Sequence, residues 1–199
     1  MPKDTFFNLD EIKRQRIVDA AIEEFSRLHY DKVTINGIVK NAGIPKGSFY
    51  QYFENKDDLY IYLFTSIASD KMNLFDSLKT KINDLGFRDY MMEYILLLKK
   101  AEVGNDRMLK LKKEFLEQCP QHIKKEILKR EMPRSLNSFR EIIISYVEKG
   151  EFKKDLNTKT AAYVTVMGIS NLEHYNFEKT DNILDVLSSI IEFLENGMT

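Results

Sequence analysis

The stretch from 33 to 56 constrains the fold most, because two short apolar patterns stand there on either side of a glycine turn. Thr34 is a residue type that caps helix N-termini, and three apolar residues follow it at helical spacing. These residues are Ile35, Ile38 and Val39. Gly43 suits the left-handed conformation that ends a helix. A short helix is therefore predicted between Thr34 and Gly43.

A second short helix is predicted directly after this turn. Pro45 has no backbone N–H, which costs little in the first turn of a helix. Phe49 and Phe53 are four residues apart and would face inward together. The other side of this helix would carry Lys46, Gly47, Ser48, Tyr50, Gln51 and Tyr52. Two short helices joined by a tight turn indicate a helix-turn-helix, the motif whose second helix enters a DNA major groove.

The polar side of the second helix has the chemistry of a DNA contact. A helix N-terminus offers free N–H groups and partial positive charge to a phosphate, and Lys46 adds a full charge. Gly47 would let the sugar-phosphate chain approach closely, and Lys56 would hold a flanking phosphate. Tyr50 and Tyr52 offer hydroxyls and ring faces. The predicted DNA-binding residues are Thr34, Lys46, Gly47, Ser48, Tyr50, Gln51, Tyr52 and Lys56.

The charge of this stretch differs from that of the whole chain. The net charge of the 199 residues is −1, which does not favour general binding to polyanions. Between 32 and 56, four lysines and one glutamate give a local charge of +3. A compact basic face on a nearly neutral protein favours a focused contact with duplex DNA.

The run Ala-Gly-Ile-Pro-Lys-Gly-Ser-Phe-Tyr-Gln-Tyr-Phe-Glu-Asn-Lys-Asp-Asp-Leu resembles the signature of the TetR family of bacterial transcriptional regulators. In that family a glycine, a recognition helix with Gly-[Ser/Thr]-x-Tyr-x-[Tyr/His]-Phe and a following Lys-x-x-Leu recur together. The resemblance extends from about Asn8 to about Phe64. It implies an N-terminal three-helix DNA-binding domain over 1–54 and a C-terminal helical domain for ligand binding and dimerisation over 55–199.

The sequence departs from the family pattern at three positions. Gly37 stands where an acidic residue is usual, and Val39 stands where alanine is usual. Pro45 replaces the commoner Ser or Thr cap of the recognition helix. A glycine within a short helix costs about 1 kcal/mol relative to alanine, so the first helix of the motif is expected to be softer than in relatives.

The remaining chain reads as helices throughout, so the predicted fold is all-α. Asn8 with Glu11 is predicted to cap the first helix, on which Glu24 would face outward. Asn55 with Asp58 would cap a long helix. Further helices are predicted over 87–103, 106–118, 121–131, 134–149, 158–175 and 181–195, with Pro133 breaking the chain between two of them.

The last two predicted helices are apolar on more than one side, which a surface helix of a monomer does not need. Either other helices of the same chain or a second subunit must cover the extra width. Small residues near 161 and 168 would allow close approach of helices. We expect a homodimer formed through these two helices, which the TetR resemblance also implies.

The middle of the chain is rich in methionine and aromatic residues. At helical spacing such residues usually form a core, but flexible thioethers and flat rings also suit an adaptable apolar cavity. The resemblance implies a pocket in the C-terminal domain for a small apolar or amphipathic effector. The candidate ligand-binding residues are Tyr62, Met91, Met92, Tyr94, Phe115, Phe139, Tyr146, Tyr163 and Met167.

No pattern in the sequence indicates catalysis, a metal site or a cofactor. The three histidines are far apart in sequence, and no nucleophile motif or phosphate loop is present. Cys119, the single cysteine, excludes an internal disulfide and is either a buried bystander or a redox sensor. With no membrane-spanning run and no signal-peptide pattern, we expect a cytoplasmic protein.

Together with the TetR resemblance, these features predict a homodimeric transcriptional repressor that binds a palindromic double-stranded operator. The resemblance implies that the repressor leaves the operator when a small hydrophobic effector binds. One alternative is a helical lipid- or acyl-binding protein of the same fold that does not bind DNA. The intact polar set on the second helix of the motif argues against this alternative. The other alternative, an enzyme, lacks any supporting motif.

Overall fold

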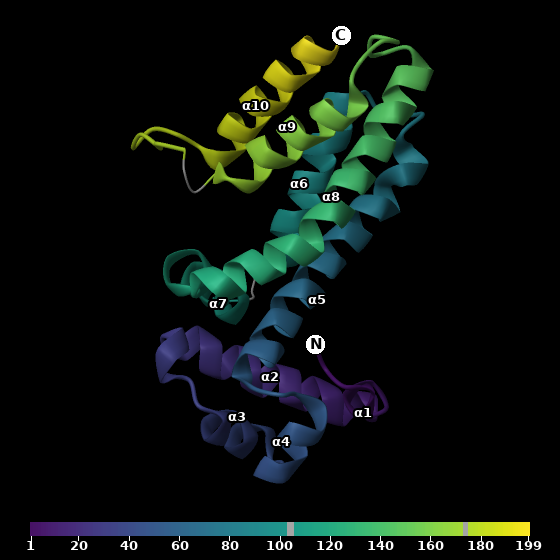
Figure 1. The fold of residues 1–199 in the computed structure, drawn as a ribbon. Coiled ribbons are helices and arrows are strands. Elements are labelled where there is room, and N and C mark those ends of the chain that lie inside the picture. The colour runs from purple at the N-terminus through teal and green to yellow at the C-terminus, as the bar shows by residue number, and fades with distance from the viewer. Residues whose placement is uncertain (103–105, 173–174) are drawn as a thin grey trace. The chain divides into compact units, whose positions relative to one another are not determined.

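The computed structural model describes residues 1–102, 106–172 and 175–199, and these residues form helices and no strands (Figure 1). The prediction of an all-α fold is confirmed. The α-helices are α1 (Asp4–Phe7), α2 (Glu11–Arg27), α3 (Ile35–Ala42), α4 (Lys46–Tyr52), α5 (Lys56–Ser77), α6 (Phe87–Glu102), α7 (Asp106–Gln118), α8 (Gln121–Lys149), α9 (Thr158–Ser170) and α10 (Ile183–Met198). Short 3₁₀ turns lie at Tyr30–Lys32 and Leu78–Lys81. None of the helices in these ranges is long and apolar enough to cross a bilayer.

The chain packs into two compact units, each with its own apolar core. The first unit comprises Met1–Ser69 and Glu102–Arg130, and the second comprises Asp70–Ala101 and Glu131–Thr199. The sequence suggested a simpler division between residues 54 and 55. The packing instead groups α7 with α2, where Arg107 lies 2.9 Å from the Glu23 carboxylate. Helices α5 and α8 therefore contribute residues to both units.

The corner between α3 and α4 forms as its residue types predict. The Thr34 hydroxyl accepts a hydrogen bond from the Gly37 N–H at 3.1 Å and so caps α3. Gly43 has a φ of 62°, in the left-handed region. The Ile44 N–H then donates to the Val39 carbonyl at 3.0 Å, which satisfies one of the last carbonyls of α3. These local bonds fix the direction in which α4 leaves the turn.

The N-terminal cap of α2 differs from the prediction. Asp10, and not Asn8, accepts the hydrogen bond from the Lys13 N–H, at 2.8 Å. Asn8 lies at the C-terminal end of α1, where its N–H donates to the Asp4 carbonyl. The sequence prediction missed α1, because a helix of a single turn has too short a pattern to recognise.

The prediction that Glu24 faces outward is also wrong, since its side chain is buried in the first unit. Its carboxylate accepts hydrogen bonds from Arg27 at 2.8 Å and from Asn41 at 3.0 Å, which satisfies the buried charge. A Cβ atom on Gly37 would lie 2.5 Å from the Glu24 carboxylate. Gly37 on α3 therefore leaves space for the carboxylate of Glu24, which α2 supplies.

The sequence predicted that Pro133 would break the chain between two helices, and this prediction is wrong. Pro133 lies inside α8. The proline removes one backbone hydrogen bond, a cost of about 3 kcal/mol in a helix interior. Pro133 is exposed, so the carbonyl that loses its partner can be reached by water. Apolar side chains on both sides, such as Ile127 and Phe139, are buried and hold the helix on to its neighbours.

Other helix ends shift by a few residues. Asn55 accepts from the Asp58 N–H at 2.9 Å, as predicted, but α5 ends at Ser77 and a 3₁₀ turn replaces its expected last turn. Asn157 caps α9 by accepting a hydrogen bond from the Thr160 N–H at 3.0 Å. Helix α9 ends at Ser170 and not near 175, and the predicted helix over 87–103 ends at Glu102, with residue 103 outside the described residues. In the second unit, α9 and α10 run side by side (Figure 1).

Candidate nucleic-acid interface

Helix α4 has one buried side and one exposed side. Phe49 and Phe53 are fully buried, with ring centroids 5.5 Å apart. On the other side Lys46, Gly47 and Gln51 are exposed, and Tyr50 is 44% exposed. An amphipathic helix of two turns thus presents a row of hydrogen-bonding and positively charged groups to the surroundings.

Gly47 is not required by the packing of the protein itself. Among the described glycines, only Gly43 and Gly150 have a φ in the left-handed region, so the backbone conformation of Gly47 does not require glycine. A Cβ atom at Gly47 would meet no described atom within 4 Å. Glycine is unfavourable in a helix, so its presence at an open site is best explained by a molecule that must approach the backbone there.

Two of the predicted DNA-contact residues are occupied within the protein. Tyr52 is 5% exposed, and its ring lies 6.2 Å from that of Phe6. The Lys56 ammonium donates to the carbonyls of Tyr30 at 2.9 Å and Val33 at 3.2 Å, and lies 4.4 Å from the centre of the Tyr30 ring. Lys56 therefore ties the start of α5 to the loop before α3.

The other predicted contacts keep more of their surface. Thr34 is exposed although its hydroxyl caps α3, and Ser48 is half-buried in α4. The structure thus brings Thr34, Lys46, Gly47, Ser48, Tyr50 and Gln51 to the α3–α4 region with accessible atoms. Two residues that the sequence prediction missed, Lys3 and Thr5, donate hydrogen bonds to carbonyls of α4. The signal that the sequence offers for this segment is the apolar residue Phe6 between polar neighbours, which the structure buries.

The nine candidate ligand-binding residues do not come together in one place. Tyr62 and Phe115 belong to the first unit, where Phe115 stacks on Phe64 at 4.3 Å. Seven belong to the second unit, in which Met91, Tyr94, Phe139 and Tyr146 are buried while Met92 and Met167 are half-buried. The seventh, Tyr163 of α9, is 53% exposed.

In the second unit these side chains pack as a core. Phe139 stacks on Phe75 at 4.4 Å, and Tyr94 meets Phe75 edge-on at 4.8 Å. Burial, together with the nearby Asp76, raises the pKa of Tyr94 to about 12, so this tyrosine stays neutral near neutral pH. The same burial raises the pKa of Tyr146 above its usual value.

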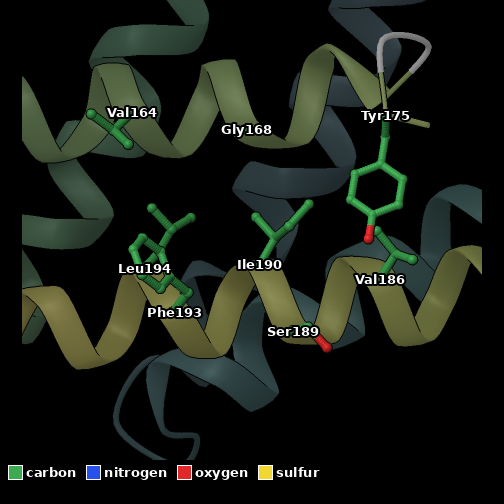
Figure 2. A pocket seen from close by; sticks show the side chains of 8 residues that line it. All are labelled: Val164, Gly168, Tyr175, Val186, Ser189, Ile190, Phe193 and Leu194. Atoms are coloured by element: carbon green, nitrogen blue, oxygen red, sulfur yellow. The ribbon is translucent and has the colours of Figure 1, made fainter. Parts of the chain in front are cut away.

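Two grooves lie instead on the outer side of α9 and α10. The first, of about 310 Å³, is lined by Val164, Gly168, Tyr175, Val186, Ser189, Ile190, Phe193 and Leu194 (Figure 2). The second, of about 260 Å³, shares Val164, Phe193 and Leu194 with it. None of the nine predicted residues lines either groove. Within the described ranges, no cluster of three or more metal-ligating side chains occurs.

Comparisons with known proteins match both the motif and the whole fold. The family described as "Bacterial regulatory proteins, tetR family" matches residues 17–63, which include α3, α4 and the start of α5. The fatty acid metabolism regulator protein of Bacillus subtilis is 25% identical over 194 residues, covering 94% of this chain and 95% of that protein.

Solved structures agree with this match. A TetR family transcriptional regulator from Chloroflexus aurantiacus is 28% identical with a TM-score of 0.55, covering 100% of this chain and 98% of that one. The transcriptional regulator FadR from Bacillus subtilis, solved in complex with stearoyl-CoA, has a TM-score of 0.65 at 20% identity, covering 93% and 99%. With its helix-turn-helix and its all-helical fold, the chain belongs to the TetR family and is a DNA-binding transcriptional regulator, not an enzyme.

Proposed function

We propose that this regulator is a homodimeric repressor that binds a palindromic operator through α4 and is released by a small amphipathic effector. The observation that carries the proposal is the exposed side of α4, on which a lysine, an open glycine and a tyrosine stand beside each other. These groups suit contacts with phosphates and base edges, and a Cβ atom at the glycine would meet no described atom within 4 Å.

In the proposed complex each residue of α4 has a distinct task. The free N–H groups at the start of α4, with Lys46, receive a phosphate. Gly47 allows the DNA backbone to come close. Tyr50 and Gln51 reach the sugar-phosphate chain or the base edges in the major groove, while Thr34 at the start of α3 faces a neighbouring phosphate.

The dimer is proposed to form through the outer side of α9 and α10. Phe193 is 78% exposed, and Tyr163 and Val164 are 53% and 44% exposed. An apolar surface of this kind normally marks an interaction site. Phe193 projects beside two grooves that it helps to line, so in a two-fold pair each Phe193 can enter a groove of the other subunit. Two α4 helices would then read half-sites about 34–36 Å apart, or a multiple of this distance.

The effector is proposed to be a long-chain acyl-CoA or a related amphipathic acyl compound. The support is the relative of nearly the same length whose name assigns it to fatty acid metabolism, together with the FadR structure that contains stearoyl-CoA. Adaptable methionines such as Met91 and Met92 in the core of the second unit suit a site that opens around an acyl chain. Release requires that the effector bind the DNA-free form more tightly than the DNA-bound form.

The first experiment selects binding sites from random duplex DNA and measures affinity by fluorescence anisotropy at several salt concentrations. We expect selected sites to be palindromic and stearoyl-CoA, but not coenzyme A alone, to release them. Lys46→Ala should weaken binding and flatten the salt dependence by about one phosphate contact. Lys99→Ala, an exposed lysine of α6 that removes the same charge, is the matched control. Equal behaviour of the two variants would refute the role of α4.

The dimer is tested separately by analytical ultracentrifugation. Phe193→Asp should give a monomer, whereas Leu96→Asp, at a leucine of α6 that is 52% exposed, should leave the dimer intact. A wild-type protein that sedimented as a monomer at micromolar concentration would contradict the proposed interface. A non-palindromic selected site would contradict the paired reading of DNA.

A further inference from the structure

The C-terminal end of α4 leaves three backbone carbonyls without a helical partner. The Phe53 N–H donates to the Phe49 carbonyl at 2.9 Å and ends the regular bonding of the helix. The next amide, that of Glu54, donates to the Asp58 carboxylate at 3.3 Å and so does not bond within α4. The carbonyls of Tyr50, Gln51 and Tyr52 must find donors from elsewhere.

All three carbonyls receive a hydrogen bond from the segment Lys3–Phe6, which lies more than 40 residues earlier in the sequence. The Lys3 ammonium donates to the Tyr50 carbonyl at 2.9 Å, and the Lys3 backbone N–H donates to the Tyr52 carbonyl at 2.8 Å. The Thr5 hydroxyl donates to the Gln51 carbonyl. One short segment thus satisfies the whole last turn of α4.

Phe6 anchors this segment in the apolar core. Its side chain is fully buried, and its ring lies 4.8 Å from the ring of Phe53 and 5.2 Å from that of Tyr62. The hydrogen bonds of Lys3 and Thr5 are therefore made from a fixed position. We refer to residues Lys3–Phe6 as the N-terminal clamp.

A helix as short as α4, with seven residues, is marginal by itself because helix nucleation is unfavourable. Its last turn would open readily if its carbonyls were left to water. The clamp bonds these carbonyls, and the Lys3 charge lies at the negative end of the helix dipole. The two exposed residues of that last turn, Tyr50 and Gln51, are residues proposed above to contact DNA.

We propose that the N-terminal clamp is part of the DNA-reading site, with Lys3 and Thr5 as positioning residues that hold the last turn of α4 in its binding geometry. The inference rests on the proposed reading of DNA by α4. It predicts that loss of the clamp lowers DNA affinity without removing any group that touches DNA. The binding-competent geometry is then populated for only part of the time, which reduces the apparent affinity by that fraction.

The decisive variants are Thr5→Val and Thr5→Ser. Valine keeps the shape of threonine but removes the hydroxyl donor, whereas serine keeps the donor. We expect Thr5→Val to weaken binding to the selected DNA about fivefold, roughly the worth of one hydrogen bond, and Thr5→Ser to bind like the wild type. The salt dependence should stay unchanged in both, because no charge is altered.

A second readout follows α4 in the free protein. Amide hydrogen exchange of residues 49–53 should become faster in Thr5→Val and in Lys3→Ala, with Lys3→Arg restoring protection. Amides of α6, in the second unit, should keep their exchange rates. Lys3→Ala should also weaken DNA binding, and a salt dependence unchanged from the wild type would separate positioning from a direct phosphate contact.

The outcomes separate this inference from the proposed function. If Tyr50→Ala weakens DNA binding and Thr5→Val does not, the clamp has no positioning role and only the inference fails. If neither variant weakens binding, the assignment of α4 itself fails. If Thr5→Val and Thr5→Ser weaken binding equally, the effect does not come from the hydroxyl bond and the inference is overturned.

Discussion

Replacing Gly47 with alanine should move stability and DNA affinity in opposite directions. A Cβ atom at this position meets no described atom within 4 Å, and the backbone of Gly47 is not in the left-handed region. Alanine is favoured over glycine in a helix by about 0.5–1 kcal/mol. Because Gly47 is the second residue of a short helix, we expect the lower part of that range, about 0.5 kcal/mol of added stability.

The same methyl group should weaken DNA binding. If a phosphate approaches the start of α4, the added carbon displaces it and lengthens the hydrogen bonds from the backbone N–H groups. Charge-assisted hydrogen bonds of this kind are about twice as strong as neutral ones. We expect a loss of affinity of tenfold or more, which corresponds to at least about 1.4 kcal/mol.

Urea unfolding followed by circular dichroism measures the first effect, and fluorescence anisotropy with the selected duplex at fixed salt measures the second. Gly86→Ala is the control, since a Cβ atom there lies at an ordinary 3.9 Å from the nearest atom, in the second unit. It should leave DNA affinity unchanged. A Gly47→Ala protein with higher stability and undiminished affinity would refute the close approach of DNA at this residue.

Three further predictions concern groups held inside the protein. Lys56→Met should lower the free energy of unfolding by about 1 kcal/mol, because it removes the ammonium that donates to the carbonyls of Tyr30 and Val33. The salt dependence of DNA binding should stay nearly unchanged. A salt slope reduced by one full contact would show that Lys56 does bind a phosphate. Burial raises the pKa of the Cys119 thiol to about 11, so a thiol reagent at pH 8 should react far more slowly with native than with urea-unfolded protein, and equal rates would contradict its burial. The pKa of Tyr94 is raised to about 12 from an unfolded value near 10, so its contribution to stability should be complete below pH 10 and lost as the pH rises towards 12. Urea unfolding of Tyr94→Phe between pH 10 and pH 12 should therefore show a smaller loss of stability than the wild type.

The parts of the fold that the sequence predicts are those decided by local chemistry. Thr34 and Asn55 cap helices because each side chain reaches the amide three residues ahead, whatever the rest of the chain does. Gly43 ends α3 for the same local reason. The inward side of α4 at Phe49 and Phe53 also follows from spacing, but Tyr52, which was predicted on the outward side, is buried beside Phe6.

The features that were missed depend on residues distant in sequence. Pro133 continues a helix because buried neighbours hold both sides of it, and Glu24 turns inward because Asn41 offers a partner. A methionine or tyrosine at helical spacing looks the same whether it fills a core or lines a cavity. The candidate ligand residues therefore included Tyr94, which is packed against Phe75, and Tyr163, which is exposed.

The contact between Glu24 and Gly37 has a consequence for building chimaeras within the family. A recognition module taken from a relative with an acidic residue at position 37 would place a second carboxylate against Glu24, whose carboxylate lies 2.5 Å from where a Cβ would stand. The added side chain would collide with the Glu24 carboxylate and bring a like charge beside it, so one of the two side chains would have to move. A graft of α3 and α4 alone should misfold at this seam, whereas a graft that also replaces α2 carries its own matching partner.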